Sequence, residues 1–329
     1  MSRIALDGMG GDFAPQSNVE GAVRAARRGM EVLLVGDEAQ LRPLLEEAHA
    51  SDGVRVVHAP DAIGMSEHSA RETRNRRQSS IYVGIDLLKR GEADAFVSMG
   101  NTGAVLAVAF FALGRLPGVD RPALGGLLPT ERGQTLLLDV GANADARPPH
   151  LVEFARLGSA YMRRATQVPE PGVALLNIGE EPSKGSTLTV EAHALLAARS
   201  DIRFLGNIES RELLSGDADV IVTDGFTGNV ALKLMEGTAS LLFSELRRAA
   251  RRSPLAAAGA LLLRGSLEGL RDRVDYRRRG GAPLLGVNGI VMVGHGRSDG
   301  AAVESALVAA SSAADAGILA ALREAVAEV

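Results

Sequence analysis

Two segments of the sequence carry hydroxyl and amide side chains between glycines at matching positions. Residues 91–105 and 216–230 are identical at eight of fifteen positions. Each segment begins as an apolar strand-like run, passes through a loop of Ser, Thr or Asn between glycines, and continues as an apolar helical run. Such a strand–turn–helix unit presents backbone N–H groups and hydroxyls at a helix N-terminus, where an anion is stabilised. The repeat therefore predicts two related halves with two anion-binding loops that face one cleft.

The two loops supply candidate ligands for a phosphate group. Repetition favours a shared function over two unrelated connectors, because Thr102 and Thr227 keep the same register. Asp224 stands where the first copy has Met99, and it is a candidate catalytic residue because a carboxylate there can orient a group or accept a proton. The candidate phosphate- or substrate-binding residues of the two loops are Ser98, Gly100, Asn101, Thr102, Gly103, Thr227, Gly228 and Asn229.

Lysine is rare in this chain: only three of the 36 basic residues are lysines. Lys184 lies in the polar loop 179–186, and Lys233 lies one turn into the helix predicted after the second repeat loop. A compact ammonium group is a good point charge for phosphate. We predict that Lys184, as a catalytic residue, or Lys233, as a phosphate ligand, supplies this charge, with an ordinary surface lysine as the alternative for Lys184. The residues around Lys184 do not have the order of an ATP-binding P-loop.

Two further loops follow predicted strands. Gly10, Gly11 and Asp12 resemble half of a dinucleotide-binding fingerprint, but Phe13 takes the place of the third glycine. Asp7 and Asp12, which flank the glycines, are therefore either turn residues or active-site carboxylates, and a nucleotide cofactor is not expected. His295 lies between two glycines, where it can act as a proton donor or as a partner of an oxyanion. The other histidines lack the spacing of metal ligands, so we expect no metal.

Composition excludes several classes of protein. The net charge of −4 argues against a nucleic-acid partner. The absence of cysteine excludes disulfides, thiolate metal sites and an acyl-cysteine intermediate, and it fits a cytoplasmic protein. We expect no signal peptide, because no basic segment followed by an apolar run is present at the start. In the uncharged stretch 95–114 the apolar run is about half of the ~20 residues that a membrane span needs, so we predict a buried helix.

Strand-like and helix-like segments alternate along most of the chain. The predicted strands are residues 4–7, 32–35, 54–58, 95–98, 123–128, 134–139, 173–176, 202–205, 220–223 and 289–293. The predicted helices are residues 18–28, 38–49, 81–90, 104–113, 150–164, 188–199, 230–252 and 301–329. This alternation predicts an α/β fold with a mostly parallel sheet covered on both faces, in which ligands bind beyond the carboxyl ends of the strands. The polar loops fall at those ends.

Residues 247–279 form a basic segment, with ten arginines against three acidic residues. A solvated helix face is the usual explanation for such a segment. The more specific explanation is docking of an acidic partner or of an anionic membrane, to which the apolar run 254–263 would add. The segment 253–286 is therefore a candidate membrane- or partner-facing surface within a chain predicted to form a single domain over residues 1–329.

These motifs together resemble the phosphate acyltransferase family of bacterial phospholipid synthesis (PlsX type). The matching segments, in order along nearly the whole chain, are residues 4–15, 91–104, 139–143, 176–181, 206–209, 224–233 and 280–290. The resemblance adds Asn143 to the candidate substrate-binding residues. It implies a three-layer α/β/α sandwich with a mostly parallel mixed sheet and two interlaced halves, similar to isocitrate and isopropylmalate dehydrogenases. It also implies a homodimer, loose membrane association, and transient contact with the downstream acyl phosphate-dependent glycerol-3-phosphate acyltransferase.

By resemblance, the reaction transfers a fatty acyl group from acyl-acyl carrier protein to inorganic phosphate and gives acyl phosphate for phosphatidic acid and phospholipid synthesis. Phosphate is itself a nucleophile, so the enzyme mainly has to hold and orient it. The thioester oxygen needs hydrogen-bond donors as it becomes an oxyanion. No metal, nucleotide or redox cofactor is needed. The acidic carrier protein is expected to dock on the segment 247–279 or on Arg71, Arg74, Arg76 and Arg77.

The chain departs from the family pattern in two places. Gln78 stands where the family usually has an aspartate, and three arginines at 277–279 stand where it tends to have an acidic and aromatic segment. Three other functions fit parts of the sequence: a phosphotransacetylase-type enzyme that uses acyl-coenzyme A, a nicotinamide-dependent dehydrogenase of the same architecture, and a non-catalytic scaffold at the membrane surface. The full set of polar loops makes the scaffold the weakest of these alternatives.

Overall fold

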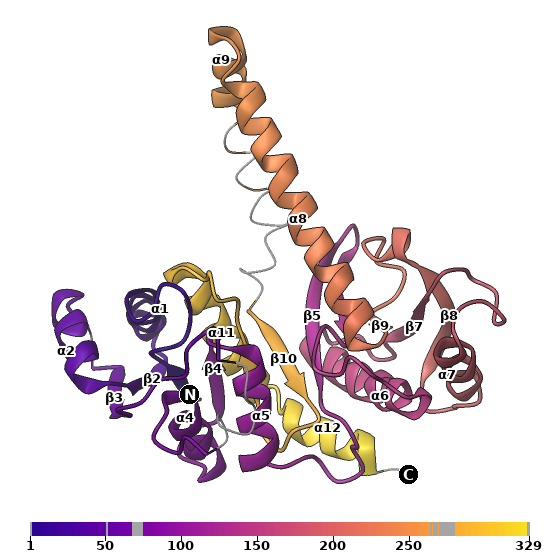
Figure 1. Cartoon of the computed structure of the whole chain (residues 1–329), viewed down its shortest axis with the longest axis horizontal. Coiled ribbons are helices and arrows are strands. Elements are labelled where there is room, and N and C mark those ends of the chain that lie inside the picture. The colour runs from indigo at the N-terminus through magenta and orange to yellow at the C-terminus, as the bar shows by residue number, and fades with distance from the viewer. Residues whose placement is uncertain are drawn as a thin grey trace.

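The computed structural model describes residues 2–50, 52–67, 75–263 and 280–327, together with Gly265 and Gly269. Within these residues, eleven strands form one sheet (Figure 1). In sheet order the strands are β3 (Val54–His58), β2 (Glu31–Gly36), β1 (Arg3–Asp7), β4 (Ala95–Ser98), β11 (Val291–Val293), β10 (Ala282–Leu285), β5 (Ala123–Thr130), β6 (Gly133–Leu138), β9 (Val220–Val222), β7 (Gly172–Asn177) and β8 (Arg203–Glu209).

The sheet consists of two parallel blocks that join through antiparallel strands. β3, β2, β1, β4 and β11 run parallel to one another, and so do β6, β9, β7 and β8. β10 is antiparallel to both of its neighbours, and β5 pairs antiparallel with β6. The predicted mixed, mostly parallel sheet is thus confirmed. The sequence does not predict β10, because its four residues, Ala-Pro-Leu-Leu, show no alternation and become a strand only through pairing on both sides.

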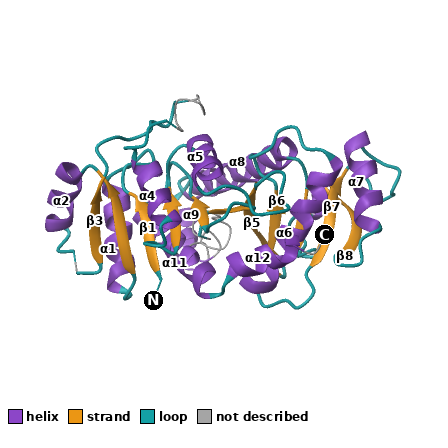
Figure 2. Cartoon of the chain, turned by 90° about the horizontal axis from the view of Figure 1, so that it is seen from below, coloured by secondary structure: helices purple, strands orange, loops and turns teal. Residues whose placement is uncertain are grey.

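Helices cover both faces of the sheet (Figure 2). One core cluster receives apolar side chains from α1 (Gln16–Arg27), α2 (Glu38–Glu47), α6 (Pro148–Ala165), α7 (Thr187–Ala197), α11 (Gly300–Asp315) and α12 (Ile318–Ala327). The other receives them from α4 (Ser80–Lys89), α5 (Thr102–Ala112) and the start of α8 (Gly225–Ala250). Successive strand residues point to opposite faces, so Ile4 and Leu6 lie in the first cluster and Ala5 in the second. The result is a three-layer α/β/α sandwich.

The two C-terminal helices connect the two halves of the fold. Helix α11 packs on α1 in the first half, whereas α12 packs on α6 in the second. The sequence predicts one helix over residues 301–329, and this prediction is wrong in one respect, because the segment forms two helices. Gly317, between them, has a φ of +66°, a left-handed conformation that favours glycine.

Helix α8 extends beyond the body of the molecule and carries α9 (Pro254–Leu262) at its far end (Figure 1). We call residues 237–263 the arm. Its leucines are largely exposed, for example 84% for Leu255 and 87% for Leu262. Most of the basic segment beyond residue 263 lies outside the described residues. Among the described helices, none alone is long and apolar enough to span a membrane, while α11 and α12 meet the length and composition criteria as a pair bent by 57°.

The two halves repeat a pair of strands and the loops that follow them. β1 lies parallel beside β4, and β6 lies parallel beside β9. A fully buried aspartate ends the first strand of each pair: Asp7 is the last residue of β1, and Asp139 directly follows β6. Burial raises the pKa of both carboxyls, although each accepts hydrogen bonds from the loop after it. These two carboxylates anchor the loops that surround the candidate site.

Asp7 holds the first glycine-rich loop against the first repeat loop. Its carboxylate accepts hydrogen bonds from the Ser98 hydroxyl at 2.7 Å and from the N–H of Met9 at 3.1 Å. Gly10 lies so close to Gly100 that a Cβ added at Gly10 would stand 2.7 Å from the Gly100 nitrogen. Glycine is required at position 10 because the two loops approach each other backbone to backbone.

Asp139 holds the equivalent loop in the second half. Its carboxylate accepts five hydrogen bonds, from the N–H groups of Leu124 (3.1 Å), Gly141 (3.0 Å), Ala142 (2.9 Å) and Asn143 (2.7 Å) and from the Asn143 side-chain amide (2.9 Å). A Cβ added at Gly228 would stand 1.9 Å from the Asp139 carbonyl oxygen, so α8 also approaches this loop backbone to backbone. One buried side chain thus sets the position of a whole loop.

Residues 61–67 form a strap beside the first repeat loop. The Asn101 side-chain amide donates to the carbonyl oxygens of Met65 at 3.0 Å and Glu67 at 2.7 Å. Arg76 forms ion pairs with Asp61 and with Glu67, the latter at 2.5 Å. These contacts hold the strap at both of its ends.

We expect Asp139→Asn to destabilise the fold. The amide NH₂ would replace an oxygen that accepts hydrogen bonds, so at least one buried N–H donor would lose its partner, at a cost of about 1–3 kcal/mol. The free energy of unfolding in urea measures this loss. Asp145→Asn is the matched control, because Asp145 is exposed in the same loop. Equal stability of the two variants would contradict the anchoring role of Asp139.

We expect the strap to be released at acid pH. The hydrogen bond from Arg76 lowers the pKa of Asp61. The pKa of Glu67 is lowered mainly by the hydrogen bond from the Gly64 N–H and secondly by the hydrogen bond from Arg76. Both carboxyls thus have lower pKa values in the folded chain than in the unfolded chain. Their ion pairs and hydrogen bonds therefore stabilise the folded strap above roughly pH 4, and this stabilisation is lost as the pH falls through the folded pKa values. Amide-exchange protection of residues 61–67 should therefore fall in acid before that of β1 falls.

Arg76→Gln tests the same clamp at neutral pH. This variant removes both ion pairs of the strap, so protection of residues 61–67 should be lost while the amides of β1 stay protected. Unchanged protection of the strap in this variant would show that Arg76 does not hold it.

Candidate functional site

A cavity of about 270 Å³ lies where the loops of the two halves meet. The first repeat loop contributes Met99 and Thr102, and the second contributes Asn229, with Lys233 on the following turn of α8. The other lining residues are Leu124, Gly126, Leu127, Val140, Gly141, Leu232, Glu236, Gly281, Ala282, Val293, Gly294, His295, Ser298, Ala302 and Ala306. The structure therefore brings both repeat loops to one cavity, as the sequence predicts.

Five polar side chains of the cavity, those of Thr102, Asn229, Lys233, Glu236 and His295, are at least partly exposed, and we call them the rim; the sixth, Ser298, is buried. The Lys233 side chain is 60% exposed, and its ammonium lies 3.9 Å from the Glu236 carboxylate. An ion pair this long between a mobile lysine and a carboxylate is weak, so an incoming anion can compete for the ammonium. Thr102 is the first residue of α5, where the helix N-terminus favours negative charge, and Asn229 is the fifth residue of α8, just beyond its first turn.

Each of these helices begins at a side-chain cap. Asn101 caps α5 by accepting the N–H of Ala104 at 3.0 Å, and Asp224 caps α8 by accepting the N–H of Thr227 at 2.9 Å. Because Met99 cannot cap as Asp224 does, α5 begins two positions later in the repeat than α8. This cap also explains why α8 begins at residue 225 rather than at the predicted 230.

Several predicted site residues are engaged in the loop framework. Asp224 also accepts the Thr227 hydroxyl at 2.7 Å. The Ser98 hydroxyl donates to Asp7, and the Asn143 amide donates to the Pro122 carbonyl oxygen at 2.8 Å as well as to Asp139. These contacts give Asp224, Thr227, Ser98 and Asn143 structural roles. Their direct participation in substrate binding or catalysis remains a prediction.

His295 lies on the rim with a defined ring orientation. Its Nδ1 accepts the N–H of Arg297 at 3.1 Å, so in the neutral ring the proton resides on Nε2. The neighbouring Gly296 carbonyl accepts the N–H of Asp12 at 2.6 Å, which connects this loop to the first glycine-rich loop. Of the predicted residues in that loop, Gly10 and Gly11 therefore lie in the backbone support of the rim rather than among the cavity-lining residues.

Lys184 lies in the loop after β7, and its side chain is exposed. It is outside the residues that line the cavity, whereas Lys233 is among them. The geometry thus favours Lys233 over Lys184 as the source of positive charge near a bound anion. A catalytic role of Lys184 remains a prediction.

Of the four arginines predicted to dock the carrier protein, two belong to the residues that the structure describes. Arg71 and Arg74 lie outside the described residues. Arg76 is held by Asp61 and Glu67 in the strap, while Arg77 is exposed. Among the described residues, no group of three or more His, Cys, Asp or Glu side chains is arranged to hold a metal ion.

The anchoring role of Asp7 and Asp139 is not predicted from the sequence. A signal for it exists, because each is preceded by leucine at the end of an apolar run and followed by glycine within two residues. The small residues Ala302 and Ala306, which contribute only space to the cavity wall, are likewise not predicted.

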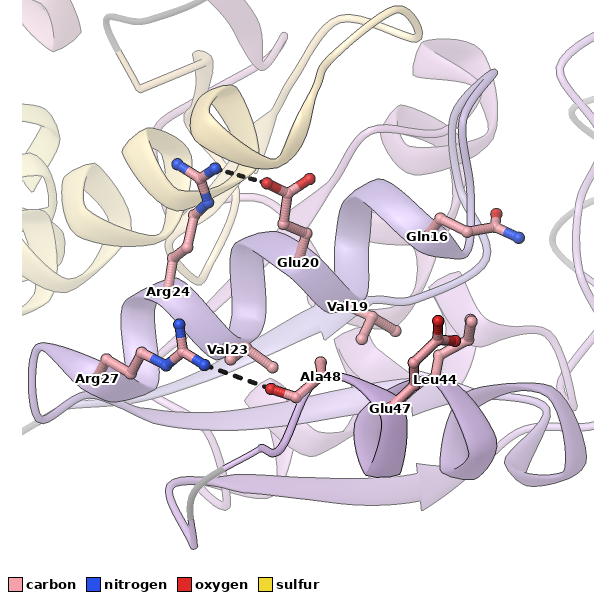
Figure 3. A pocket seen from close by; sticks show the side chains of 9 residues that line it. All are labelled: Gln16, Val19, Glu20, Val23, Arg24, Arg27, Leu44, Glu47 and Ala48. Atoms are coloured by element: carbon pink, nitrogen blue, oxygen red, sulfur yellow. Dashed lines mark hydrogen bonds and ion pairs between the residues drawn. The ribbon is translucent and has the colours of Figure 1, made fainter.

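A second, larger cavity of about 390 Å³ lies between α1 and α2 (Figure 3). Both of its arginines already have partners: Arg24 pairs with Glu20 at 2.6 Å, and Arg27 donates to the Ala48 carbonyl at 3.3 Å. None of the loops identified above contributes to its lining. The smaller cavity between the halves is therefore the candidate site.

Comparison with known proteins identifies the family and supports the fold. A family model described as "Fatty acid synthesis protein" matches residues 2–321. The phosphate acyltransferase of Thermus thermophilus is 52% identical over 322 residues, which cover 98% of each chain. The phosphate acyltransferase of Myxococcus xanthus is 50% identical over 326 residues, covering 97% of this chain and 92% of the relative.

Solved structures with lower identity share the fold. A phosphotransacetylase from Streptococcus pyogenes superposes with a TM-score of 0.63 at 18% identity, covering 96% of this chain and 94% of the other. A 4-hydroxythreonine-4-phosphate dehydrogenase from Klebsiella pneumoniae superposes with a TM-score of 0.58 at 15% identity, covering 95% and 100%. The predicted dehydrogenase-like α/β/α class is confirmed. On its family model and its relatives, the chain belongs to the fatty acid synthesis protein (PlsX-type phosphate acyltransferase) family, and it is an acyltransferase whose reaction is acyl transfer to phosphate.

Proposed function

We propose that this enzyme transfers a fatty acyl group from acyl-acyl carrier protein to inorganic phosphate and so supplies acyl phosphate for phosphatidic acid and phospholipid synthesis. The observation that carries the proposal is the cavity whose rim combines Thr102, Asn229, Lys233 and His295 and whose remaining wall is mostly apolar. Such a site can hold an anion and an acyl group side by side.

The reaction mainly requires that phosphate and the thioester are positioned next to each other. A phosphate oxygen attacks the thioester carbonyl carbon, a C–O bond forms, and the carbonyl oxygen takes up the negative charge. Collapse of this oxyanion breaks the C–S bond and releases the carrier thiolate, which is protonated by solvent. In our proposal Thr102, Asn229 and Lys233 orient the phosphate, and the Nε2–H of His295 donates to the oxyanion. A thiolate leaves readily, so a strong general acid is not required.

We further propose that the enzyme is cytoplasmic, that it forms a homodimer, and that it contacts the inner face of the membrane and the downstream acyltransferase transiently. Exposed leucines of the arm, flanked by Arg247, Arg248, Arg251 and Arg252, support contact with an anionic lipid surface. The acidic carrier protein would dock on exposed basic residues such as Arg77 or those of the arm.

The reaction class is tested by acyl phosphate formation from phosphate and palmitoyl-acyl carrier protein, with palmitoyl-coenzyme A in parallel. Hydroxylamine trapping detects the product, and a thiol reagent detects the released carrier. Product from the carrier-bound donor supports the proposal. Product from the coenzyme A donor alone would assign a phosphotransacetylase-type activity instead.

Asn229→Ala and Lys233→Ala should weaken phosphate use. Each removes a polar contact to an anion, so we expect kcat/KM for phosphate to fall about 10- to 150-fold, the equivalent of about 1.5–3 kcal/mol. Lys89→Ala is the matched control, because Lys89 is an exposed lysine outside the cavity. Unchanged turnover in either cavity variant would remove that residue from the site, and Lys184→Ala assayed beside them tests the other lysine.

Leu255→Glu and Leu262→Glu should weaken binding to vesicles of phosphatidylglycerol and phosphatidylethanolamine. Loss of a buried leucine corresponds to about 1.5–3 kcal/mol, so co-sedimentation should fall at least about tenfold. Leu195→Glu is the matched control, because Leu195 is 42% exposed on α7. A fall in molar mass by light scattering, with vesicle binding unchanged, would assign the arm to the homodimer instead.

A further inference from the structure

The wall of the cavity below its polar rim is apolar and buried. We call this part the apolar floor. It consists of Met99, Leu124, Val140, Val293, Ala302 and Ala306, each at most 6% exposed. Their side chains offer only carbon and sulfur atoms, and the backbone N–H of Leu124 already donates to Asp139. These six side chains therefore provide no partner for a polar ligand group, and among the buried side chains that line the cavity Ser298 is the one with a polar group.

Small residues create the space above this floor. Ala302 and Ala306 are four positions apart on α11, so they lie on one face of the helix and line the cavity together. Gly126 of β5 belongs to the same lining: a Cβ added there would stand 3.2 Å from Val140 Cγ1 and 3.9 Å from Leu232 Cδ2. Larger side chains at these three positions would fill the cavity.

We propose that the apolar floor receives the carbon chain of the acyl donor, and that Ala302, Ala306 and Gly126 determine the chain length that the enzyme accepts. This inference rests on the proposed function, because it assigns the floor to the acyl part of that donor. The carrier's pantetheine arm is the less favourable occupant, since its two amide groups would lose several hydrogen bonds to water and Ser298 is the one buried polar side chain in the lining.

Burial of the acyl chain on the apolar floor predicts how strongly kcat/KM depends on chain length. Each methylene moved from water into an apolar site contributes about 0.8 kcal/mol, which is roughly a fourfold change in kcat/KM. The cavity of about 270 Å³ is slightly smaller than the ~300–1,000 Å³ that ligand pockets usually have, so a few added carbons remove a large share of its space.

The test compares donors of different chain length in variants of the wall. Ala306→Leu should lower kcat/KM for palmitoyl-acyl carrier protein at least tenfold relative to a butyryl donor. The ratio of kcat/KM for the palmitoyl donor to kcat/KM for the butyryl donor should also fall in Gly126→Ala, by a smaller factor. Ala301→Leu is the control, because Ala301 lies on the same helix but outside the cavity lining. This variant should show the same ratio as the wild-type enzyme.

The outcomes separate the inference from the proposed function. An unchanged ratio, or an equal loss with both donors in a variant that melts like the wild type, overturns the inference. If Ala306→Leu does not fold, Gly126→Ala decides, because the backbone of Gly126 has no positive φ and accepts alanine.

A second measurement does not depend on turnover. The fluorescent fatty acid cis-parinaric acid should bind the wild-type chain and bind Ala306→Leu at least tenfold more weakly. Turnover without this difference overturns the apolar floor as the chain site. Absence of turnover with every donor would overturn the proposed function, while the difference in fatty acid binding would still support the floor.

Discussion

Hydrogen bonds from loop N–H groups to two buried aspartates hold the structure around the cavity. Asp7 and Asp139 are fully buried, and burial raises the pKa of each carboxyl. A charge in such surroundings is tolerated only when donors surround it, and five donors surround Asp139. The loops that supply these donors are thereby fixed, and the glycines among them allow the close backbone contacts that follow.

The two anchored loops meet although the parallel blocks that carry them run in opposite directions. The antiparallel pairs β11–β10, β10–β5 and β5–β6 reverse the strand direction three times between the blocks. β4 and β9 are five steps apart in the sheet, about 24 Å at ~4.8 Å per step. The usual sheet twist of about 20–25° per strand rotates one block relative to the other over these steps. Helices α5 and α8 pack on the same face of the sheet, and residues near both N-termini line one cavity.

Polar side chains around the cavity divide into two groups by their place. Ser98, Asn101, Asn143 and Asp224 bond to backbone or to anchoring groups of the loops. Thr102, Asn229, Lys233 and His295 line the cavity itself. In the proposed reaction this division would place the groups that meet phosphate on a loop framework that is already formed, which is the condition for catalysis by orientation.

The sequence by itself determined the α/β class, ten of the strands and the repeat of anion-binding loops, because hydrophobic periodicity and glycine-rich turns are local properties. Residue types alone could not separate Lys233 from Lys184, or substrate ligands from helix caps, since these roles depend on which groups a side chain meets. β10, the anchoring aspartates and the alanine-lined floor likewise required the tertiary structure. Each arises from contacts between segments far apart in the chain, and such contacts leave no periodic pattern in the sequence.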